Sequence, residues 1–308
     1  MVAITEALTF DDVLLLPRYS SILPATTNIS LHLTNKITLK VPFISSAMDT
    51  VTESKMAIAI AKEGGLGIIH RNLDIKNQSR EIKKVKNKKY LVGAAIGTNK
   101  EDFDRARSLV SHGVDLIVID TAHGHSEKVL RTLTNIKKII KKVPICVGNI
   151  ATGEAAKKLY NSGADIIKVG IGPGSICTTR LIAGIGVPQL SAILNVRKGI
   201  KNKNIKIISD GGIKYSGDLA KAFAAGADAV MIGSLFAGTD ETPGKLVKRN
   251  GKLFKSFRGM GSVGAMNKGS ADRYFQSKQK DVSKYVPEGV EGFAKYKGKV
   301  DLIIYKLV

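Results

Sequence analysis

The segment His112-Gly113-Val114-Asp115, followed by the apolar run LIVID at 116–120, decides the fold of this chain. The same order of features recurs where Ser162-Gly163-Ala164-Asp165 precedes IIKVG and where Ala225-Gly226-Ala227-Asp228 precedes AVMIG. In each copy a helix-like stretch ends in a glycine suited to a left-handed C-cap, and an acidic residue and a short apolar run follow. Continuous apolar runs of this length are typical of strands buried on both faces of a parallel sheet.

Working outward from these three copies, further apolar runs complete a regular series. The candidate strands are at residues 41–47, 65–70, 91–96, 115–120, 144–147, 165–169, 205–209 and 229–232. Amphipathic, lysine-rich stretches such as 54–63 and 101–111 lie between them. Eight strands that alternate with helices predict an α/β fold of the (β/α)8 type, a TIM barrel, rather than an open doubly wound sheet.

The composition fits a folded enzyme. The 308 residues include 48 basic and 26 acidic side chains, and 44% are hydrophobic, which is ample for a core. The formal net charge of +22 raises the alternative of a nucleic-acid-binding protein. However, 37 of the basic residues are lysine and only 11 are arginine, and we find no zinc-finger, RNP-type or helix-turn-helix signature. We therefore expect no specific nucleic-acid partner.

The two cysteines, Cys146 and Cys177, are too few for a disulfide framework, and no CxxC pair suggests zinc. We therefore expect a reducing, cytoplasmic setting. The first ten residues lack a signal-peptide pattern, and no apolar run is long enough to span a membrane, so we expect no membrane partner.

Two regions depart from the rhythm of strands and helices. The stretch 235–299 holds no clear βα unit and is rich in Gly, Ser and Lys, which is typical of a functional lid or of a disordered segment. Residues 300–308 look like the beginning of a final helix that stops early. We expect a single catalytic barrel domain over 1–308, with a flap at roughly 240–299 after the eighth strand.

The ends of the seventh and eighth strands predict a phosphate site. Strand seven ends in Ser209-Asp210-Gly211-Gly212, and strand eight ends in Ile232-Gly233-Ser234. Glycines let backbone N–H groups approach a phosphate, and the hydroxyl of Ser234 adds a donor. Asp210 is then placed to accept hydrogen bonds from sugar hydroxyls. The alternative for the DGG sequence alone is a tight turn with a helix cap.

A cysteine in a glycine-rich loop follows the sixth strand, within GIGPGSICTTR at 170–180. A loop at a strand's carboxyl end exposes Cys177 to substrate and to backbone dipoles that favour the thiolate, which suits nucleophilic catalysis. Cys146 lies inside a strand and fits a small buried core residue instead. His123 and His125 follow strand four, but no carboxylate pattern completes a metal site with them. Asp120, at the end of that strand, is better placed to hold a ribose hydroxyl.

Several long motifs, in order along the chain, carry a family resemblance. They are LTFDDVLLLP (8–17), SSAMDTVTES (45–54), IDTAHGHS (119–126), GIGPGSICTTR (170–180), SDGGIKYSGD (209–218), RGMGSVGAM (258–266), ADRYFQ (271–276) and VPEGVEG (286–292). The chain resembles the inosine-5′-monophosphate (IMP) dehydrogenases of bacterial type, which are (β/α)8 barrels.

The resemblance implies a reaction in two halves, which is the committed step of guanine nucleotide synthesis. Cys177 would attack C2 of the hypoxanthine ring, and hydride would leave to NAD⁺ to give a covalent thioimidate. A mobile flap would then replace the cofactor while water releases xanthosine monophosphate. Arg273 matches the family's unusual arginine base, and Tyr274 and Thr179 match the residues that assist it. Guanidinium is normally protonated, so such a base needs a strongly perturbed microstate in a closed site.

The resemblance also implies binding residues, position by position. Substrate contacts fall on Ser175, Asp210, Gly211, Gly212, Gly233, Ser234, Phe257, Arg258, Gly259, Met260, Gly261 and Glu288. The cofactor side matches Asp120, Gly170, Ile171 and Gly172. The carbonyls of Gly172, Gly174 and Cys177 match a potassium site. The family forms tetramers, so we expect a homotetramer.

Three departures from the family pattern stand out. Phe257 occupies a position where the family generally has tyrosine, and the lost hydroxyl predicts one phosphate contact fewer. Between Arg71 and Leu91 there is room for only one helix, whereas most members insert paired CBS regulatory modules there. The chain also ends before the family's C-terminal segment, which helps to build the potassium site across a subunit boundary.

Two alternatives for the function remain beside the dehydrogenase. Guanosine monophosphate reductase is a related barrel that carries a CTTR-containing cysteine loop and has no regulatory insert, and the short length favours it. The RGMGS, DRYFQ and VPEGVEG motifs favour the dehydrogenase, because a hydrolytic flap serves a step that the reductase does not perform. The other alternative is a truncated barrel that binds purine nucleotide without turnover.

Overall fold

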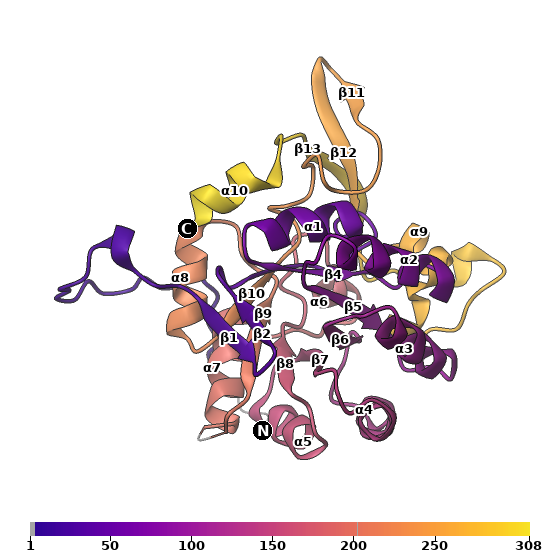
Figure 1. The fold of residues 1–308 in the computed structure, drawn as a ribbon, viewed down its shortest axis with the longest axis horizontal. Helices are drawn as coiled ribbons and strands as arrows, with labels where there is room; N and C mark the ends of the chain where they lie inside the picture. The colour runs from indigo at the N-terminus through magenta and orange to yellow at the C-terminus, as the bar shows by residue number, and fades with distance from the viewer. Residues whose placement is uncertain (1–3, 202) are drawn as a thin grey trace.

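The computed structural model describes residues 4–201 and 203–308 and contains a closed barrel of eight parallel strands (Figure 1). The strands follow chain order around the barrel, and β10 pairs with β3 to close it, with Val230 opposite Phe43. They are β3 (Phe43–Ser45), β4 (Leu66–Ile69), β5 (Val92–Ile96), β6 (Leu116–Asp120), β7 (Ile145–Ile150), β8 (Ile166–Val169), β9 (Lys206–Asp210) and β10 (Ala229–Ile232). The predicted (β/α)8 fold is confirmed, and each predicted strand overlaps an observed one.

A helix follows almost every strand and covers the outside of the barrel. The main helices are α1 (Ser54–Lys62), α2 (Ile75–Lys86), α3 (Glu101–Ser111), α4 (Glu127–Ile139), α5 (Gly153–Asn161), α7 (Gln189–Gly199), α8 (Ser216–Ala224) and α10 (Val300–Leu307). Only α2 lies between β4 and β5, as the short connection predicts. The final helix α10 packs against α1 and completes the ring.

Side chains alternate between two cores along each strand. In β6, Leu116 and Val118 point into the barrel, while Ile117 and Ile119 pack against the helices. All four are fully buried, which explains why these strands read as unbroken apolar runs. Cys146 belongs to the inner core, as predicted, and burial raises the pKa of its thiol to about 12.

The repeated aspartates act at the opposite end of the barrel from the strand ends that bear the expected site. Asp115 accepts hydrogen bonds from Lys86 at the end of α2 (2.7 Å) and from the backbone N–H of Val92 at the start of β5 (2.9 Å). Asp165 accepts from Lys137 and Ile145 in the same way, and Asp228 accepts from Arg197 and Ile207. We call these three groups the aspartate clamps. Each one fastens the start of a strand to the start of the preceding strand and to the helix that leads into that preceding strand.

A hairpin that the sequence pattern did not reveal covers the same end of the barrel. Its strands are β1 (Leu31–Thr34) and β2 (Ile37–Leu39), which pair antiparallel. Leu33, Ile37 and Leu39 are fully buried and join the inner core. The hairpin therefore seals the barrel floor and leaves access to the interior at the carboxyl ends of the strands.

The stretch 235–299 contains no βα unit, as the sequence predicts, but it is more regular than the expected lid or disordered segment. It contains an antiparallel sheet of β11 (Val247–Arg249), β12 (Lys252–Arg258) and β13 (Glu291–Lys295), which projects from the barrel (Figure 1). Between β12 and β13 lie the short α9 (Val263–Ala265) and a 3-10 turn, η3 (Ala271–Tyr274). The outer strands expose charged side chains on both faces, so they lack the apolar pattern of a buried strand.

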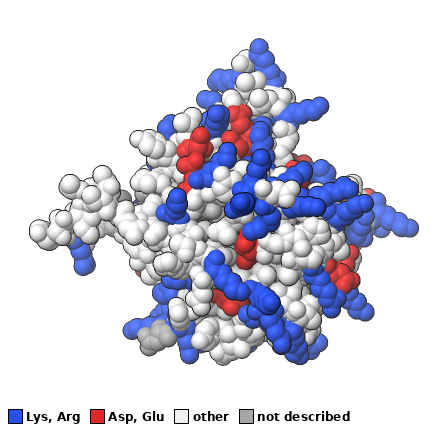
Figure 2. Space-filling view, viewed as in Figure 1, with Lys and Arg blue, Asp and Glu red and all other residues white. Residues whose placement is uncertain are grey.

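On the face shown in Figure 2, lysines and arginines are spread widely rather than gathered in one patch. The segment 14–23, which we call the N-terminal arm, departs from this pattern, because it exposes apolar side chains, among them Leu14, Leu16 and Tyr19. In Figure 1 the arm extends away from the barrel. Within the described ranges, no helix has the length and apolar character that crossing a membrane requires.

Candidate active site

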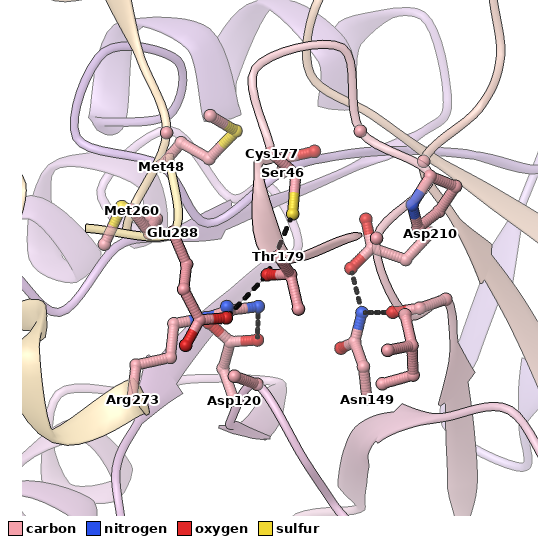
Figure 3. A pocket seen from close by; sticks show the side chains of 18 of the residues that line it. Ser46, Met48, Asp120, Asn149, Cys177, Thr179, Asp210, Met260, Arg273 and Glu288 are labelled. Carbon is pink, nitrogen blue, oxygen red and sulfur yellow. Dashed lines mark hydrogen bonds and ion pairs between the residues drawn. The ribbon is translucent and has the colours of Figure 1, made fainter. Parts of the chain in front are cut away.

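A hollow at the carboxyl ends of the strands brings most of the expected site residues together (Figure 3). It holds about 820 Å³ including its open mouth, within the size range of ligand sites. Its wall combines the ends of β6, β8 and β9, the loop after β8, and the segments 259–260, 273–274 and 288. Residues that are far apart in the sequence therefore share one cavity, as the barrel topology predicts.

The candidate nucleophile, Cys177, lies in the loop after β8. Cys177 is partly exposed, and its Sγ lies 3.2 Å from Oγ1 of Thr179. The Thr179 hydroxyl donates to Oε2 of Glu288 at 2.7 Å, so the three side chains form a chain (Figure 3). The backbone N–H of Thr178 donates to the carbonyl of Glu288, which fastens the cysteine loop to the 286–290 segment. A carboxylate and a hydroxyl are thus held beside the thiol.

Glycines are required where the backbone bends beneath this loop. Gly170 has φ of 153°, and a Cβ there would lie 2.1 Å from the carbonyl oxygen of Asp210. Gly211 has φ of 91°, and its Cβ would lie 3.0 Å from Pro173 of the cysteine loop. The close approach of the β8 and β9 ends therefore depends on residues without a side chain.

A buried group of charges lies across the hollow from Cys177. Lys168, on β8, donates to Oδ1 of Asp120 at 3.0 Å and to Oδ2 of Asp210 at 2.6 Å. Asn149 donates to the same Asp210 oxygen at 2.9 Å. Burial alone would raise the pKa of Asp120, but the adjacent charges of Arg273 and Lys168 outweigh it and hold that pKa well below its usual range. Asp120 is therefore an anion here.

Arg273 is docked on this group. Its Nε donates to Oδ2 of Asp120 at 2.8 Å, and its NH1 donates to the hydroxyl of Tyr274 at 3.0 Å. Burial tends to lower the pKa of Arg273, but the Asp120 carboxylate raises it well above its ordinary value. Burial also raises the pKa of Tyr274. In this arrangement the guanidinium is held protonated, which is the opposite of the state that a base needs.

The expected site residues divide into two sets. Those that line the hollow are Cys177, Thr179, Arg273, Tyr274, Asp120, Gly170, Ile171, Gly172, Gly174, Asp210, Gly211, Gly259, Met260 and Glu288. Those that lie outside its wall are Ser175, Gly212, Gly233, Ser234, Phe257, Arg258 and Gly261. Phe257 belongs to the buried core, and Arg258 is paired with Asp49 at 2.5 Å.

The wall also contains residues that the sequence reasoning missed, chiefly Ser46, Met48, Asn149 and Lys168. Ser46 and Met48 follow β3, and the strand-end rule applied to that strand would have found them. Lys168 stands alone in the apolar run IIKVG, and a single cation inside a buried strand was the available signal.

His123 and His125 do not converge. Their ring centroids are 6.3 Å apart, and the nearest carboxylate to His125, that of Glu154, is 3.9 Å away. Among the residues that the structure describes, no group of three or more His, Cys, Asp or Glu side chains is suited to hold a metal ion.

Comparison with known proteins gives a consistent answer. The family model for the IMP dehydrogenase / GMP reductase domain matches residues 7–308. Inosine-5′-monophosphate dehydrogenase of Borreliella burgdorferi is 47% identical, with 98% of this chain and 87% of the relative covered. The enzymes of that name from Cryptosporidium parvum (47%; 99% and 86% covered) and Aquifex aeolicus (39%; 99% and 88% covered) are also similar. The chain therefore belongs to the IMP dehydrogenase / GMP reductase family.

Proposed function

We propose that this chain oxidises IMP to xanthosine 5′-monophosphate with NAD⁺, and so supplies guanine nucleotide synthesis. The observation that carries the proposal is the placement of Cys177 in one hollow with two separate polar groups. One is Thr179 with Glu288, and the other is Arg273 with Asp120. The similarity to curated IMP dehydrogenases supports the same substrate.

In the first half-reaction the Cys177 thiolate adds to C2 of the purine ring. The C2 hydrogen leaves with its electron pair, and the product is a thioimidate in which the ring is bonded to Sγ. When bound, NAD⁺ supplies the acceptor for that hydride. The loop glycines hold Cys177 at the mouth of the barrel, and Asp210 is placed to accept hydrogen bonds from the ribose of the nucleotide.

In the second half-reaction water adds to C2, and the C–S bond breaks to release the product and the thiol. A base must take a proton from that water, and the hollow offers two candidates. The resemblance favours Arg273, which must lose a proton although Asp120 stabilises its charged form. The geometry favours the Thr179 hydroxyl backed by the Glu288 carboxylate, because proton transfer to that carboxylate needs no neutral guanidine.

The cofactor side of the hollow fits a ribose. Asp120 is buried and anionic, and carboxylates of this kind at strand ends accept hydrogen bonds from ribose hydroxyls. The run Gly170, Ile171 and Gly172 leaves the backbone open to a ligand along the same wall. In this structure the Arg273 guanidinium donates to the Asp120 carboxylate. The cofactor ribose and Arg273 would therefore bind the same carboxylate one after the other.

A potassium ion would be held by the carbonyls of Gly172, Gly174 and Cys177. The turn fits this role in part. Gly172 adopts φ of 78°, which bends the backbone into a tight turn, but the carbonyl of Gly174 already accepts a hydrogen bond from the N–H of Cys177 at 3.1 Å. A bound ion would fix the cysteine loop rather than take part in bond changes.

We propose a single catalytic domain over 1–308 with a flap at roughly 240–299, a cytoplasmic location and no specific nucleic-acid partner. A homotetramer is supported by the exposed apolar side chains of the N-terminal arm, Leu14 and Tyr19 among them, which a neighbouring subunit would cover.

The test is NADH formation from IMP, followed at 340 nm with and without potassium. We expect NADH and xanthosine monophosphate in equal amounts at steady state. NADPH-dependent release of ammonia from guanosine monophosphate would show instead the reductase alternative. Nucleotide binding without either reaction would show a barrel that binds purine nucleotide only.

A further inference from the structure

The segment that carries Arg273 is attached to the barrel through its neighbour, Asp272. Arg71, which follows β4, donates from NH1 to Oδ2 of Asp272 at 3.0 Å, and its NH2 lies 2.8 Å from Oδ1. Asn99, which follows β5, donates to Oδ2 of the same carboxylate at 2.9 Å. Asp272 therefore joins η3 to the ends of two barrel strands.

The barrel is shaped to receive this contact. The Arg71 side chain is 6% exposed although it ends in a charge. Gly97 lies beneath the pair, and a Cβ there would come within 2.7 Å of Arg71 NH1 and 2.8 Å of Asp272 Oδ2. Arg71 is buried and meets a carboxylate from another segment, and the absence of a side chain at Gly97 leaves the space for this pair. The barrel surface is therefore specifically shaped for the ion pair.

Two further contacts hold the same segment. The backbone N–H of Ala122, just after β6, donates to the carbonyl of Arg273 at 2.8 Å. Asn72 donates to the carbonyl of Ala265, seven residues before Asp272 in the chain, at 3.1 Å. The strand ends of β4, β5 and β6 therefore all contribute to docking.

We propose that Arg71 and Asp272 form a clasp that positions Arg273 and Tyr274 in the docked state and so favours hydrolysis over renewed cofactor binding. This inference rests on the proposed function. Because the clasp is adjacent to Arg273, it delivers the guanidinium to Asp120, the carboxylate that we also assign to the cofactor. A weaker clasp leaves Asp120 accessible to the cofactor for a larger fraction of the time, and the rate of hydrolysis falls. Arg71 and Asp272 are positioning residues, since neither lines the hollow.

The clasp makes a kinetic prediction that a purely structural role does not. In Asp272→Asn the shape is kept and the charge is lost, so docking weakens by about tenfold. The first burst of NADH keeps its amplitude, the steady-state rate falls by about tenfold, and inhibition by excess NAD⁺ begins at a lower concentration. Arg71→Lys keeps the charge without the planar fork and gives a smaller change in the same direction.

Docking itself is measured by hydrogen exchange of the free enzyme, without any substrate. Peptides covering 120–124 and 266–276 should exchange faster in Asp272→Asn, because the Ala122 amide is protected by Arg273. The matched control is Asp104→Asn, which removes an exposed carboxylate paired with Arg107 on α3. Exchange in Asp272→Asn equal to that of Asp104→Asn would overturn the clasp, and so would a burst that falls together with the steady-state rate.

The two proposals fail in different ways. If the chain does not oxidise IMP but these peptides still exchange faster in Asp272→Asn, the clasp stands as a docking contact and the proposed function is wrong. If the enzyme is active and exchange does not change, the function stands and the clasp is wrong. A thermal melt of each variant shows whether the barrel itself remains folded.

Discussion

The two ends of the barrel use the same residue types in opposite ways. At the floor, Asp115 and Asp165 each pair with one lysine, and Asp228 pairs with Arg197 and Lys206, so the three clamps share no cation. At the mouth, Asp120 and Asp210 converge on the single ammonium group of Lys168. The clamps are partly exposed, whereas Lys168 is 2% exposed.

This difference separates stability from function. Each clamp acts alone, so the loss of one removes a few hydrogen bonds and leaves the others intact. The charges at the mouth depend on one another, because removing one member leaves a buried charge without its partner. We therefore expect the loss of one clamp to lower stability slightly without altering turnover, and the loss of Cys177 or Arg273 to lower turnover with little change in stability. The loss of Lys168 should lower stability more than the loss of one clamp cation.

The largest effect is expected for Cys177→Ala. Without the thiol no covalent bond to C2 can form, so NADH production should be abolished while the nucleotide still binds. Turnover is measured by absorbance at 340 nm and binding by calorimetry. Cys146→Ala is a poor control because it opens the core, so Leu181→Ala, at an exposed residue just after the cysteine loop, serves to measure the effect of local disturbance. Unchanged turnover in Cys177→Ala would end the covalent mechanism.

Arg273→Ala should give the next largest effect. Hydride transfer does not need the docked arginine, so a burst of NADH should remain, followed by steady-state turnover slower by about 10² to 10³-fold. Stopped-flow absorbance separates the two phases. The melting temperature should change little, which sets this variant apart from a change at the floor. A slow first phase would assign Arg273 to hydride transfer instead.

Lys168→Met tests the linked charges directly. The substitution keeps the length of the side chain but leaves Asp120 and Asp210 without their shared cation, and we expect a loss of about 3 kcal/mol in the free energy of unfolding. Urea denaturation measures this loss. Lys206→Met is a matched control at the floor, because it removes one of two cations from Asp228. If both variants lose equal stability, the contrast between the two ends does not hold.

Asp165→Asn should have the smallest effect. The variant weakens one clamp, and about 1 kcal/mol of stability should be lost because the backbone N–H of Ile145 keeps an oxygen acceptor. The kcat for IMP should equal that of the unaltered enzyme. A fall in kcat at normal stability would connect the floor to the chemistry and contradict the separation.

Buried and exposed elements of the fold differ in how well the sequence predicts them. The barrel strands could be predicted because burial on both faces produces unbroken apolar runs such as 116–120. The β1–β2 hairpin alternates apolar and polar residues over only three or four positions in each strand, and β11 to β13 are largely exposed, so neither gave a long apolar run to read. An apolar run in the sequence reports a strand that is buried along several residues, and neither the short hairpin nor the exposed sheet contains such a strand.

The site could be predicted in part. Strand ends and glycines placed Cys177, Asp120 and Asp210 at the mouth, and the family resemblance added Arg273. No pattern in the sequence connects Arg273 to Asp120, since the two residues are 153 positions apart and meet only in the folded chain. The protonated state of Arg273 likewise depends on three-dimensional charge placement, which neither composition nor motifs report.

The order of pairing around the barrel has a consequence for how the protein folds. The clamps join residues 28, 29 and 31 positions apart, so neighbouring units can meet at a modest cost in loop-closure entropy. The seam between β3 and β10 joins strands from nearly opposite ends of the barrel sequence. Gly233 and Ser234, where the sequence predicts phosphate contacts, follow β10 at that seam, so a phosphate site there would form only when the seam closes. A nucleotide that needs these residues therefore binds only the finished barrel, and by mass action it protects the chain against opening at its longest-range contact.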